Sequence, residues 1–263
     1  MLVDTHCHLD FNSFDSDRQQ VIERAREAGV ERILNPGINL DSSRKVVELA
    51  YAHPEIYAAV GVHPNDALAW NENTLAGLRA LTGDAKVVAI GEIGLDYYRD
   101  RAPRELQRQI LSEQLSLAAE LGLPVIIHNR DATGDILEIL VDWHSSLVSV
   151  SSPLAGRPGV LHSYSEGEES ARDAMAMNFF IGFTGPVTFR NAPDLQAVAA
   201  ALPVERVLVE TDAPFLSPHP YRGKRNEPAL VRLVAAKIAE LNNSSYDSIA
   251  SITTANASRL FQW

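Results

Sequence analysis

The sequence opens with an apolar stretch that leads directly into His6-Cys7-His8. If residues 2–6 form a strand, side chains alternate between its two faces, so His6 and His8 point the same way. Two imidazoles on one face can bind the same metal ion. A pair of structural histidines fits this motif as well, because short histidine motifs recur by chance. Cys7 points to the other face, where we expect a small buried residue.

Residue types that bind metals follow five more apolar stretches further along the chain. These residues are His63, Glu92, His128, His162 and Asp212. The carboxyl ends of the strands in a parallel barrel meet at one mouth, where such enzymes have their active sites. Five of the eight histidines lie at predicted strand ends, and purely structural histidines would not gather there. We therefore predict that these residues share one metal site.

Eight strands are needed to bring these residues together, and the apolar pattern predicts eight. We expect strands over residues 2–6, 30–34, 56–62, 87–90, 125–127, 160–162, 179–182 and 206–209. Helical periodicity lies between them, over residues 15–29, 41–53, 72–81, 104–121, 133–143, 168–177 and 195–202. Two more helices close the chain, over residues 230–241 and 246–261. Residues 145–159 are rich in serine, proline and glycine, which is typical of a loop.

This alternation, at about 30 residues per unit, is typical of βαβ repeats in an α/β protein. The near-continuous apolar strands indicate a parallel sheet that is covered on both faces. Eight units in 263 residues predict a single (β/α)8 barrel domain over residues 1–263, with the metal site at its C-terminal mouth. A doubly wound open sheet is the alternative, but no Gly-x-Gly-x-x-Gly turn follows the first strand to support it.

The composition narrows the class of protein. Apolar residues make up 46% and charged residues 22%, as in ordinary globular domains. The net charge of −11 argues against a generally basic surface for nucleic acid. The sequence shows no signal peptide and no apolar run of about 18 residues, so we expect no membrane association. The single cysteine fits a reducing cytoplasm, and nothing in the sequence requires an obligatory protein partner.

The predicted site is suited to two divalent metal ions. Glu92, near the middle of the barrel order, would bridge them. The first ion would also be held by residues that follow strands one and eight, which are neighbours in a closed ring: His6, His8 and Asp212. The second ion would also be held by residues that follow strands five and six, namely His128 and His162. Imidazole ligands favour Zn²⁺ or Mn²⁺, whereas phosphate chemistry often uses Mg²⁺.

Three of these residues have expected catalytic roles. Glu92 would hold the two ions on either side of one carboxylate. Asp212 is suited to orient an attacking water or to take its proton. His63, which precedes a proline, is expected to contact the substrate, although it could simply cap a strand in a turn.

Two arginine-rich stretches follow strands four and eight on the mouth side, over residues 99–104 and 222–228. Because arginine binds phosphate through paired hydrogen bonds, Arg130, Arg222 and Arg225 are expected to contact the substrate. Together these arginines would form a basic rim on an acidic protein and attract phosphate locally. A solvated loop remains the alternative for any one of them.

At four motifs the sequence resembles a known family along its whole length. They are Asp4-Thr5-His6-Cys7-His8-Leu9-Asp10, Gly91-Glu92-Ile93-Gly94-Leu95-Asp96-Tyr97-Tyr98, Glu210-Thr211-Asp212-Ala213-Pro214-Phe215-Leu216 and Pro220-Tyr221-Arg222-Gly223-Lys224-Arg225-Asn226-Glu227-Pro228. These motifs are similar to those of the TatD family of metal-dependent deoxyribonucleases. The resemblance implies an amidohydrolase-type (β/α)8 barrel with one to three divalent ions. It also implies hydrolysis of phosphodiester bonds in DNA, with 3′-to-5′ exonuclease activity in some relatives.

The resemblance also implies the roles of individual residues. It assigns the two metal ions to the same histidines and carboxylates as above, with Glu92 bridging, and it associates His63 with the substrate phosphate. The sequence departs from the family pattern at residues 163–166, where Ser-Tyr-Ser-Glu replaces the usual Phe and Ser-Gly turn. Tyr164 keeps an aromatic ring for stacking. Residues 145–159 are longer than usual, and we expect them at the bottom of the barrel, away from catalysis.

Two other functions compete with DNA hydrolysis. An amidohydrolase that cleaves a C–N, ester or lactone bond of a small molecule would use the same barrel, and some relatives are described as acting on D-aminoacyl-tRNA. Such enzymes often bridge their metals with a carboxylated lysine at strand four, but Lys86 lies at the wrong end of that strand. A metal-binding scaffold without turnover is the other alternative, and a basic rim would be of no use to it.

Overall fold

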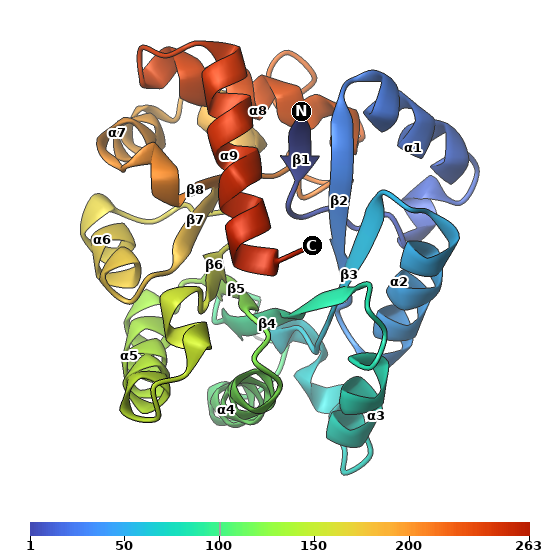
Figure 1. Cartoon of the computed structure of the whole chain (residues 1–263), viewed down its shortest axis with the longest axis vertical. Helices are drawn as coiled ribbons and strands as arrows, with labels where there is room; N and C mark the ends of the chain where they lie inside the picture. Colours follow the sequence, from blue (N-terminus) through green and yellow to red (C-terminus); the bar gives the residue numbers. More distant parts are fainter. Residues whose placement is uncertain (100) are drawn as a thin grey trace.

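The computed structural model describes residues 1–99 and 101–263, so that Asp100 of the first arginine-rich stretch lies outside the described residues. Eight parallel strands pair in sequence order and curl into the ring seen in Figure 1. They are β1 (Leu2–Asp4), β2 (Val30–Pro36), β3 (Ile56–Val60), β4 (Val87–Asp96), β5 (Val125–Arg130), β6 (Gly159–Leu161), β7 (Phe180–Phe183) and β8 (Val207–Val209). The predicted (β/α)8 barrel is confirmed.

Eight helices surround the strands in Figure 1, and none of the helices in the described part of the chain is long and apolar enough to cross a membrane. The eight are α1 (Arg18–Glu27), α2 (Leu40–Ala52), α3 (Thr74–Leu81), α4 (Arg104–Leu121), α5 (Thr133–Ser149), α6 (Glu168–Ala176), α7 (Pro193–Ala201) and α8 (Val231–Leu241). A further helix, α9 (Tyr246–Phe261), lies across the barrel. Its Asn256 donates hydrogen bonds to the carbonyl oxygens of Val204 and Val207, so α9 covers the end where the strands begin.

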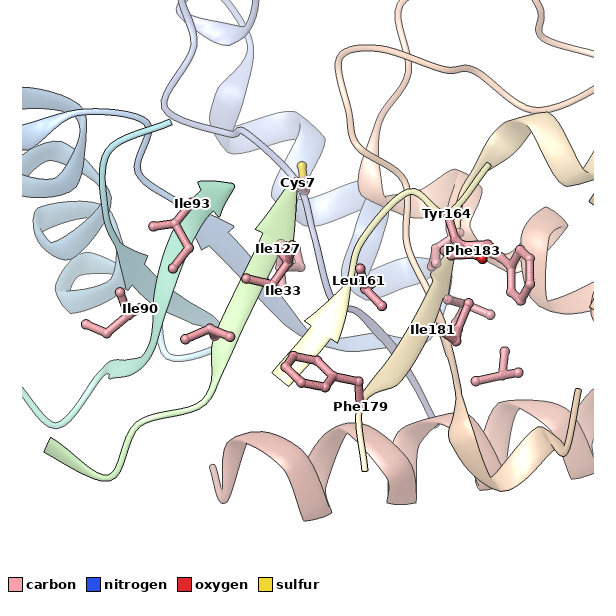
Figure 2. Packing of buried hydrophobic residues seen from close by; sticks show 14 of the residues in the cluster. Cys7, Ile33, Ile90, Ile93, Ile127, Leu161, Tyr164, Phe179, Ile181 and Phe183 are labelled. Atoms are coloured by element: carbon pink, nitrogen blue, oxygen red, sulfur yellow. The ribbon is translucent and has the colours of Figure 1, made fainter. Parts of the chain in front are cut away.

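The strand side chains alternate between two apolar clusters. The inner cluster also includes Leu260 and Phe261 of α9, and it takes side chains from all eight strands: Val3, Leu34, Ala59, Ala89, Ile126, Val160, Phe180 and Leu208. The outer cluster lies between the strands and the surrounding helices. Figure 2 shows side chains of this cluster projecting from β4 to β7: Ile93, Ile127, Leu161 and Ile181. Burial on both faces explains why the strands are almost continuously apolar.

The ring closes between β8 and β1, largely through residues that follow these strands. The backbone N–H of Asp212 donates to the carbonyl oxygen of His6 at 2.8 Å. The carboxylate of Asp4 accepts hydrogen bonds from the N–H and the hydroxyl of Thr211, at 2.9 and 2.5 Å. Closure of the barrel therefore places the segment that carries His6 beside the segment that carries Asp212.

Strands β4 and β5 are longer than expected, so Glu92 and His128 lie within strands and not at their ends. The apolar pattern of the sequence predicts a strand that ends at Ile90. Gly94 instead pairs with His128 of β5, and its φ of +148° is one that other residues rarely adopt. A Cβ at Gly94 would collide with the backbone carbonyl of His128, so this glycine permits the close approach of the two strands.

Helix α5 continues to Ser149, which corrects our expectation of a loop from residue 145 onward. Leu147 is the reason, because it is buried on the same face of α5 as Trp143. The serines are tolerated because their hydroxyls donate to helix carbonyls, Ser146 to Trp143 at 2.6 Å and Ser149 to Ser146 at 2.7 Å. A short 3-10 turn at Pro153–Gly156 then leads into β6.

Candidate metal centre

The buried carboxylate of Glu92, on β4, lies at the centre of the predicted site. Its oxygen Oε2 is 3.4 Å from Nε2 of His6 and 3.5 Å from Nε2 of His8. Its other oxygen, Oε1, is 2.9 Å from Nδ1 of His128 and 2.8 Å from Nε2 of His162. The two oxygens of one carboxylate therefore contact two different pairs of histidines.

Asp212 completes the group around the first pair. Its Oδ1 lies 3.7 Å from Nε2 of His6 and 3.5 Å from Nε2 of His8, and these two nitrogens are 3.2 Å apart. The backbone of Asp212 is left-handed, with a φ of +55°, a conformation that aspartate adopts more readily than most residues. Barrel closure and this local conformation together turn the carboxylate toward the two histidines.

The spacing of these atoms fits a divalent cation. In a tetrahedral site with metal–ligand bonds of about 2.1 Å, neighbouring ligand atoms lie about 3.4 Å apart. The Nε2 atoms of His6 and His8 are 3.2 Å apart, and each lies 3.4 to 3.7 Å from the nearest oxygens of Glu92 and Asp212. Nitrogen and carboxylate oxygen are suitable donors for Zn²⁺ and Mn²⁺. The residues of this chain therefore fit the metal that the sequence predicts.

A third histidine approaches the Oε1 side of Glu92. Nε2 of His63 is 3.4 Å from Oε1, and its ring packs edge-to-face on His128 with centroids 4.3 Å apart. Among residues 1–99 and 101–263, three groups of side chains are compact enough for one ion: His6, His8 and Asp212; His6, Glu92 and His162; and His63, Glu92 and His128. The predicted second pair, His128 and His162, thus meets at Glu92, but the two histidines belong to different compact groups.

Asp96 holds the ring of His128 from its other side, a role that the sequence analysis missed. Nε2 of His128 lies 3.3 Å from Oδ2 of Asp96, and Asn65 donates to the same oxygen at 3.0 Å. A carboxylate in this position orients a metal-binding histidine and selects its tautomer. The sequence spacing could have indicated this role. Asp96 follows Glu92 by four residues, and side chains two and four residues apart lie on the same face of a strand.

The carboxylates of Glu92 and Asp212 are ionised at neutral pH. Burial favours the neutral acid, but the neighbouring His162 and His63 and hydrogen bonds from His128 and His162 hold the pKa of Glu92 well below its usual value. The pKa of Asp212 is lowered in the same way, against burial, by a hydrogen bond from His8 and by the nearby His6. A site that keeps two carboxylates charged within the barrel is prepared for a cation.

The histidines respond to these charges in opposite directions. Burial lowers the pKa of His6 to about 4, with the neighbouring His162 adding to the effect. Burial also opposes the charged form of His8 and His128, but their carboxylate partners raise both pKa values to about 9. In the metal-free protein His8 and His128 are therefore protonated at neutral pH, and binding of a metal ion has to displace these protons.

The metal centre opens into a cavity of about 720 Å³ at the C-terminal mouth of the barrel. The cavity brings together most of the residues predicted for the site: His8, His63, Glu92, His128, Arg130, His162, Tyr164 and Asp212. His6 is fully buried behind them, and its ring stacks on that of His162 with centroids 3.9 Å apart. Residues 145–159, all of them described, do not line this cavity.

The arginines divide into two groups. Arg99, Arg101 and Arg130 line the cavity on the side of β4 and β5, and within the described residues none of them is paired with a carboxylate. Arg225 instead binds Asp17 through two hydrogen bonds of 2.7 and 2.6 Å, outside the cavity. Arg222 lies over the ring of Phe189 and likewise does not line the cavity. The expected contact of Arg222 and Arg225 with substrate stays a prediction.

Tyr164 lies at the edge of the cavity but is almost fully buried. Its hydroxyl donates to the carbonyl oxygen of Gly167 at 2.6 Å and lies 2.8 Å from the hydroxyl of Ser170. Only 5% of the residue is exposed, so little of its ring is open to a substrate. Its expected stacking role therefore also stays a prediction.

Lys86 lies at the opposite end of the barrel from the metal centre. Its Nζ donates to the carbonyl oxygens of Pro54 and Ile56, at 2.6 and 3.2 Å, where β3 begins. It packs over the ring of Tyr57, 4.1 Å from the ring centroid. A bridging carboxylated lysine at β4, as in many amidohydrolases, is therefore not what holds this centre together.

A (β/α)8 barrel with histidines and carboxylates gathered at its C-terminal mouth defines the class of metal-dependent hydrolases. The family model for TatD-related DNases matches residues 3–262, and the chain belongs to this family. The resemblance seen in the sequence motifs is thereby confirmed, and the chain is a metal-dependent hydrolase of the TatD type.

Relatives from several bacteria cover the whole chain. A metal-dependent hydrolase of Bacillus subtilis, YabD, is 46% identical over 262 residues, covering 100% of this chain and 99% of its own length. A Cronobacter sakazakii protein named 3′-5′ ssDNA/RNA exonuclease TatD is 38% identical and covers 99% of this chain and 97% of its own length. The crystal structure of the Escherichia coli TatD homologue YJJV superposes with a TM-score of 0.91 at 34% identity, covering 100% of this chain and 98% of that one.

Proposed function

We propose that this protein hydrolyses phosphodiester bonds of single-stranded DNA with two divalent ions held on either side of Glu92. The observation that carries the proposal is the division of one carboxylate between two pairs of histidines, beneath a cavity with three arginines on one wall. Such a pair of ions suits the displacement at phosphorus, in which charge develops on both the attacking and the leaving oxygen.

The residues that would hold the two ions follow from these contacts. The first ion would lie among His6, His8, Asp212 and Oε2 of Glu92, and the second among His128, His162 and Oε1. When bound, divalent ions would lower the pKa of a nearby water and stabilise negative charge on phosphate oxygens. The metal is Mg²⁺, Mn²⁺ or Zn²⁺, of which the nitrogen-rich donor set favours the last two.

We propose that Asp212 takes the proton of the attacking water. Its carboxylate is ionised at neutral pH and lines the cavity, so it can accept a hydrogen bond from a water there. As the water oxygen bonds to phosphorus, one proton passes to Asp212. The bond between phosphorus and the leaving nucleotide oxygen breaks, and that oxygen then takes up a proton from solvent.

His63 is suited to donate a hydrogen bond and not to bind metal. Its Nδ1 accepts a hydrogen bond from the backbone N–H of Asn65 at 3.0 Å. Burial, together with the nearby His128, lowers the pKa of His63, so its ring is neutral and carries its single proton on Nε2. Nε2 faces the cavity side of Glu92, where the N–H can be donated to a phosphate oxygen.

The His63→Ala variant should retain its metal content but turn over about 10- to 100-fold more slowly, because a hydrogen bond to a charged oxygen is lost. His63→Gln is the matched control, because glutamine restores an N–H donor of similar reach and should recover part of the rate. Metal content by mass spectrometry and initial rates on labelled DNA give the two readouts. Loss of one metal equivalent in His63→Ala would show that this histidine is a ligand.

The decisive experiment for the function uses single-stranded DNA labelled at its 3′ or its 5′ end. The protein is stripped with EDTA, reloaded separately with Mg²⁺, Mn²⁺ or Zn²⁺, and incubated with each substrate and with the same DNA as a duplex. We expect metal-dependent release of nucleotides, faster from single strands. Absence of cleavage with every metal would exclude DNA hydrolysis and favour a small-molecule ester or C–N bond as the substrate.

A further inference from the structure

Two phenylalanine rings line the cavity without a role in the chemistry described above. Phe11 follows β1 and stacks on the metal-site histidine His8, with ring centroids 4.7 Å apart and planes 21° apart. Phe215 follows β8 and meets Phe11 edge-on, with centroids 6.0 Å apart. Phe215 is 52% exposed and the adjacent Leu216 is 37% exposed, although both are apolar. Exposed apolar side chains gathered inside a functional cavity indicate a binding surface.

Phe215 is held in place by a buried amide and does not lie on a loosely attached loop. Its backbone N–H donates to the carbonyl oxygen of Asp212 at 2.9 Å. Its own carbonyl oxygen accepts a hydrogen bond of 2.7 Å from Nδ2 of Asn226, a residue with no exposed surface. The same Nδ2 also donates to the carbonyl oxygen of Thr211 at 2.9 Å. Because this backbone is already fixed, it loses little conformational freedom when a ligand stacks on the side chain.

The two rings lie across the mouth from Arg99, Arg101 and Arg130. In a ring of eight strands, β1 and β8 are adjacent to each other and opposite β4 and β5. Phe11 and Phe215 follow the first two of these strands, and Arg99, Arg101 and Arg130 belong to the segments of the last two. Glu92 contacts histidines from both sides, His8 after β1 and His128 on β5. A ligand that crosses the cavity therefore meets positive charge on one side and aromatic rings on the other.

We infer that Phe11 and Phe215 form a base-stacking platform for one nucleotide beside the scissile phosphate of a single-stranded substrate. This inference rests on the proposed function. A nucleotide chain carries the matching chemistry, with phosphates for the arginine side and flat bases for the aromatic side. Bases in a duplex are already stacked on each other, so the platform favours single strands and unpaired ends. Stacking accepts any base, because every base has an aromatic face.

The test of this inference measures how much one base contributes to the affinity of the protein for single-stranded DNA. Fluorescence anisotropy measures binding, in EDTA, of a labelled single-stranded oligonucleotide and of two copies that are abasic at the 3′ or the 5′ terminal nucleotide. We expect the native protein to bind one of the abasic copies about 10-fold more weakly than the complete one. In Phe215→Ala the ratio of the dissociation constants for that abasic copy and the complete oligonucleotide should fall to about 1, because the stacking partner is gone while the phosphate contacts remain.

Three further variants separate stacking from other causes. Phe215→Tyr keeps an aromatic face and should restore the ratio, whereas Phe215→Leu keeps apolar surface only and should not. Tyr51→Ala removes an aromatic residue that is 83% exposed on α2, outside the cavity, and should leave the ratio at its native value. Circular dichroism confirms that the variants are folded, as expected for an exposed position.

The outcomes distinguish the platform from the proposed function. Equal affinity of the native protein for complete and abasic DNA, or no binding of DNA at all, would overturn the platform. A ratio in Phe215→Ala that matches the native one would also overturn it. If the native protein binds DNA with the expected difference in affinity but fails to cleave it with any of the three metals, the platform stands and the nuclease activity is refuted.

Discussion

Replacement of Glu92 by glutamine is expected to lower metal-dependent hydrolysis by more than about 100-fold, which corresponds to about 2.7 kcal/mol of transition-state stabilisation. This loss is larger than the one expected when a residue that only hydrogen-bonds to a metal ligand is replaced, because Glu92 itself contacts both pairs of histidines. Glutamine keeps the shape of the side chain but removes its negative charge and leaves one oxygen in place of two. Neither ion would then retain its full set of ligands.

The measurement compares metal content, from mass spectrometry of the purified protein, with the initial rate of cleavage of labelled single-stranded DNA. Glu120→Gln is the matched control, because Glu120 is an exposed partner of Arg79 on the helical surface and surface ion pairs contribute little. It should retain both metal and rate. Full metal content together with full activity in Glu92→Gln would rule out a carboxylate shared by two ions.

Replacement of Asp212 by asparagine is expected to lower kcat by about 100- to 10,000-fold, the usual range for loss of a general base. Asparagine keeps an oxygen at the position that faces His6 and His8, but it cannot take up a proton at neutral pH. The metal at the Oε1 side of Glu92 should remain, and KM should change little, because the lost interaction acts in the transition state.

Steady-state rates across substrate concentration, with metal content measured on the same samples, separate these effects. Asp66→Asn is the matched control, since Asp66 also lines the cavity but belongs to none of the three compact groups of metal-ligand type. Its kcat should stay near the native value. If Asp212→Asn raised KM and left kcat unchanged, Asp212 would serve substrate binding, and another group would have to take the proton.

Much of the barrel and of the candidate metal-ligand residues could be predicted because the relevant signals are local. A short apolar run followed by a histidine or carboxylate identifies both a buried strand and the candidate metal ligand that follows it. The end of β4 could not be predicted, because a glycine that permits close strand packing and one that ends a strand look alike in sequence. The serines after Trp143 misled us at α5, since their hydroxyls bond to the helix they were expected to interrupt.

The roles of the arginines could not be predicted because they depend on partners far away in sequence. Arg225 and Arg130 look equally suited to phosphate, yet Arg225 is bound by Asp17 from the start of α1, whereas Arg130 lines the cavity. The pairing of Phe11 with Phe215 has the same origin, since the two rings come from opposite ends of the chain. Contacts of this kind exist only once the ring of strands has closed.

The sequence by itself determined which side chains could bind metal and on which strands they lie, because residue type and apolar periodicity are local properties. The tertiary structure decided how these side chains divide around Glu92. Oε2 faces His6 and His8 because closure of β8 on β1 fixes that side of the site, whereas Oε1 faces His128 and His162 from β5 and β6. Separations of a few ångströms depend on strand register and closure, which join residues more than 200 positions apart.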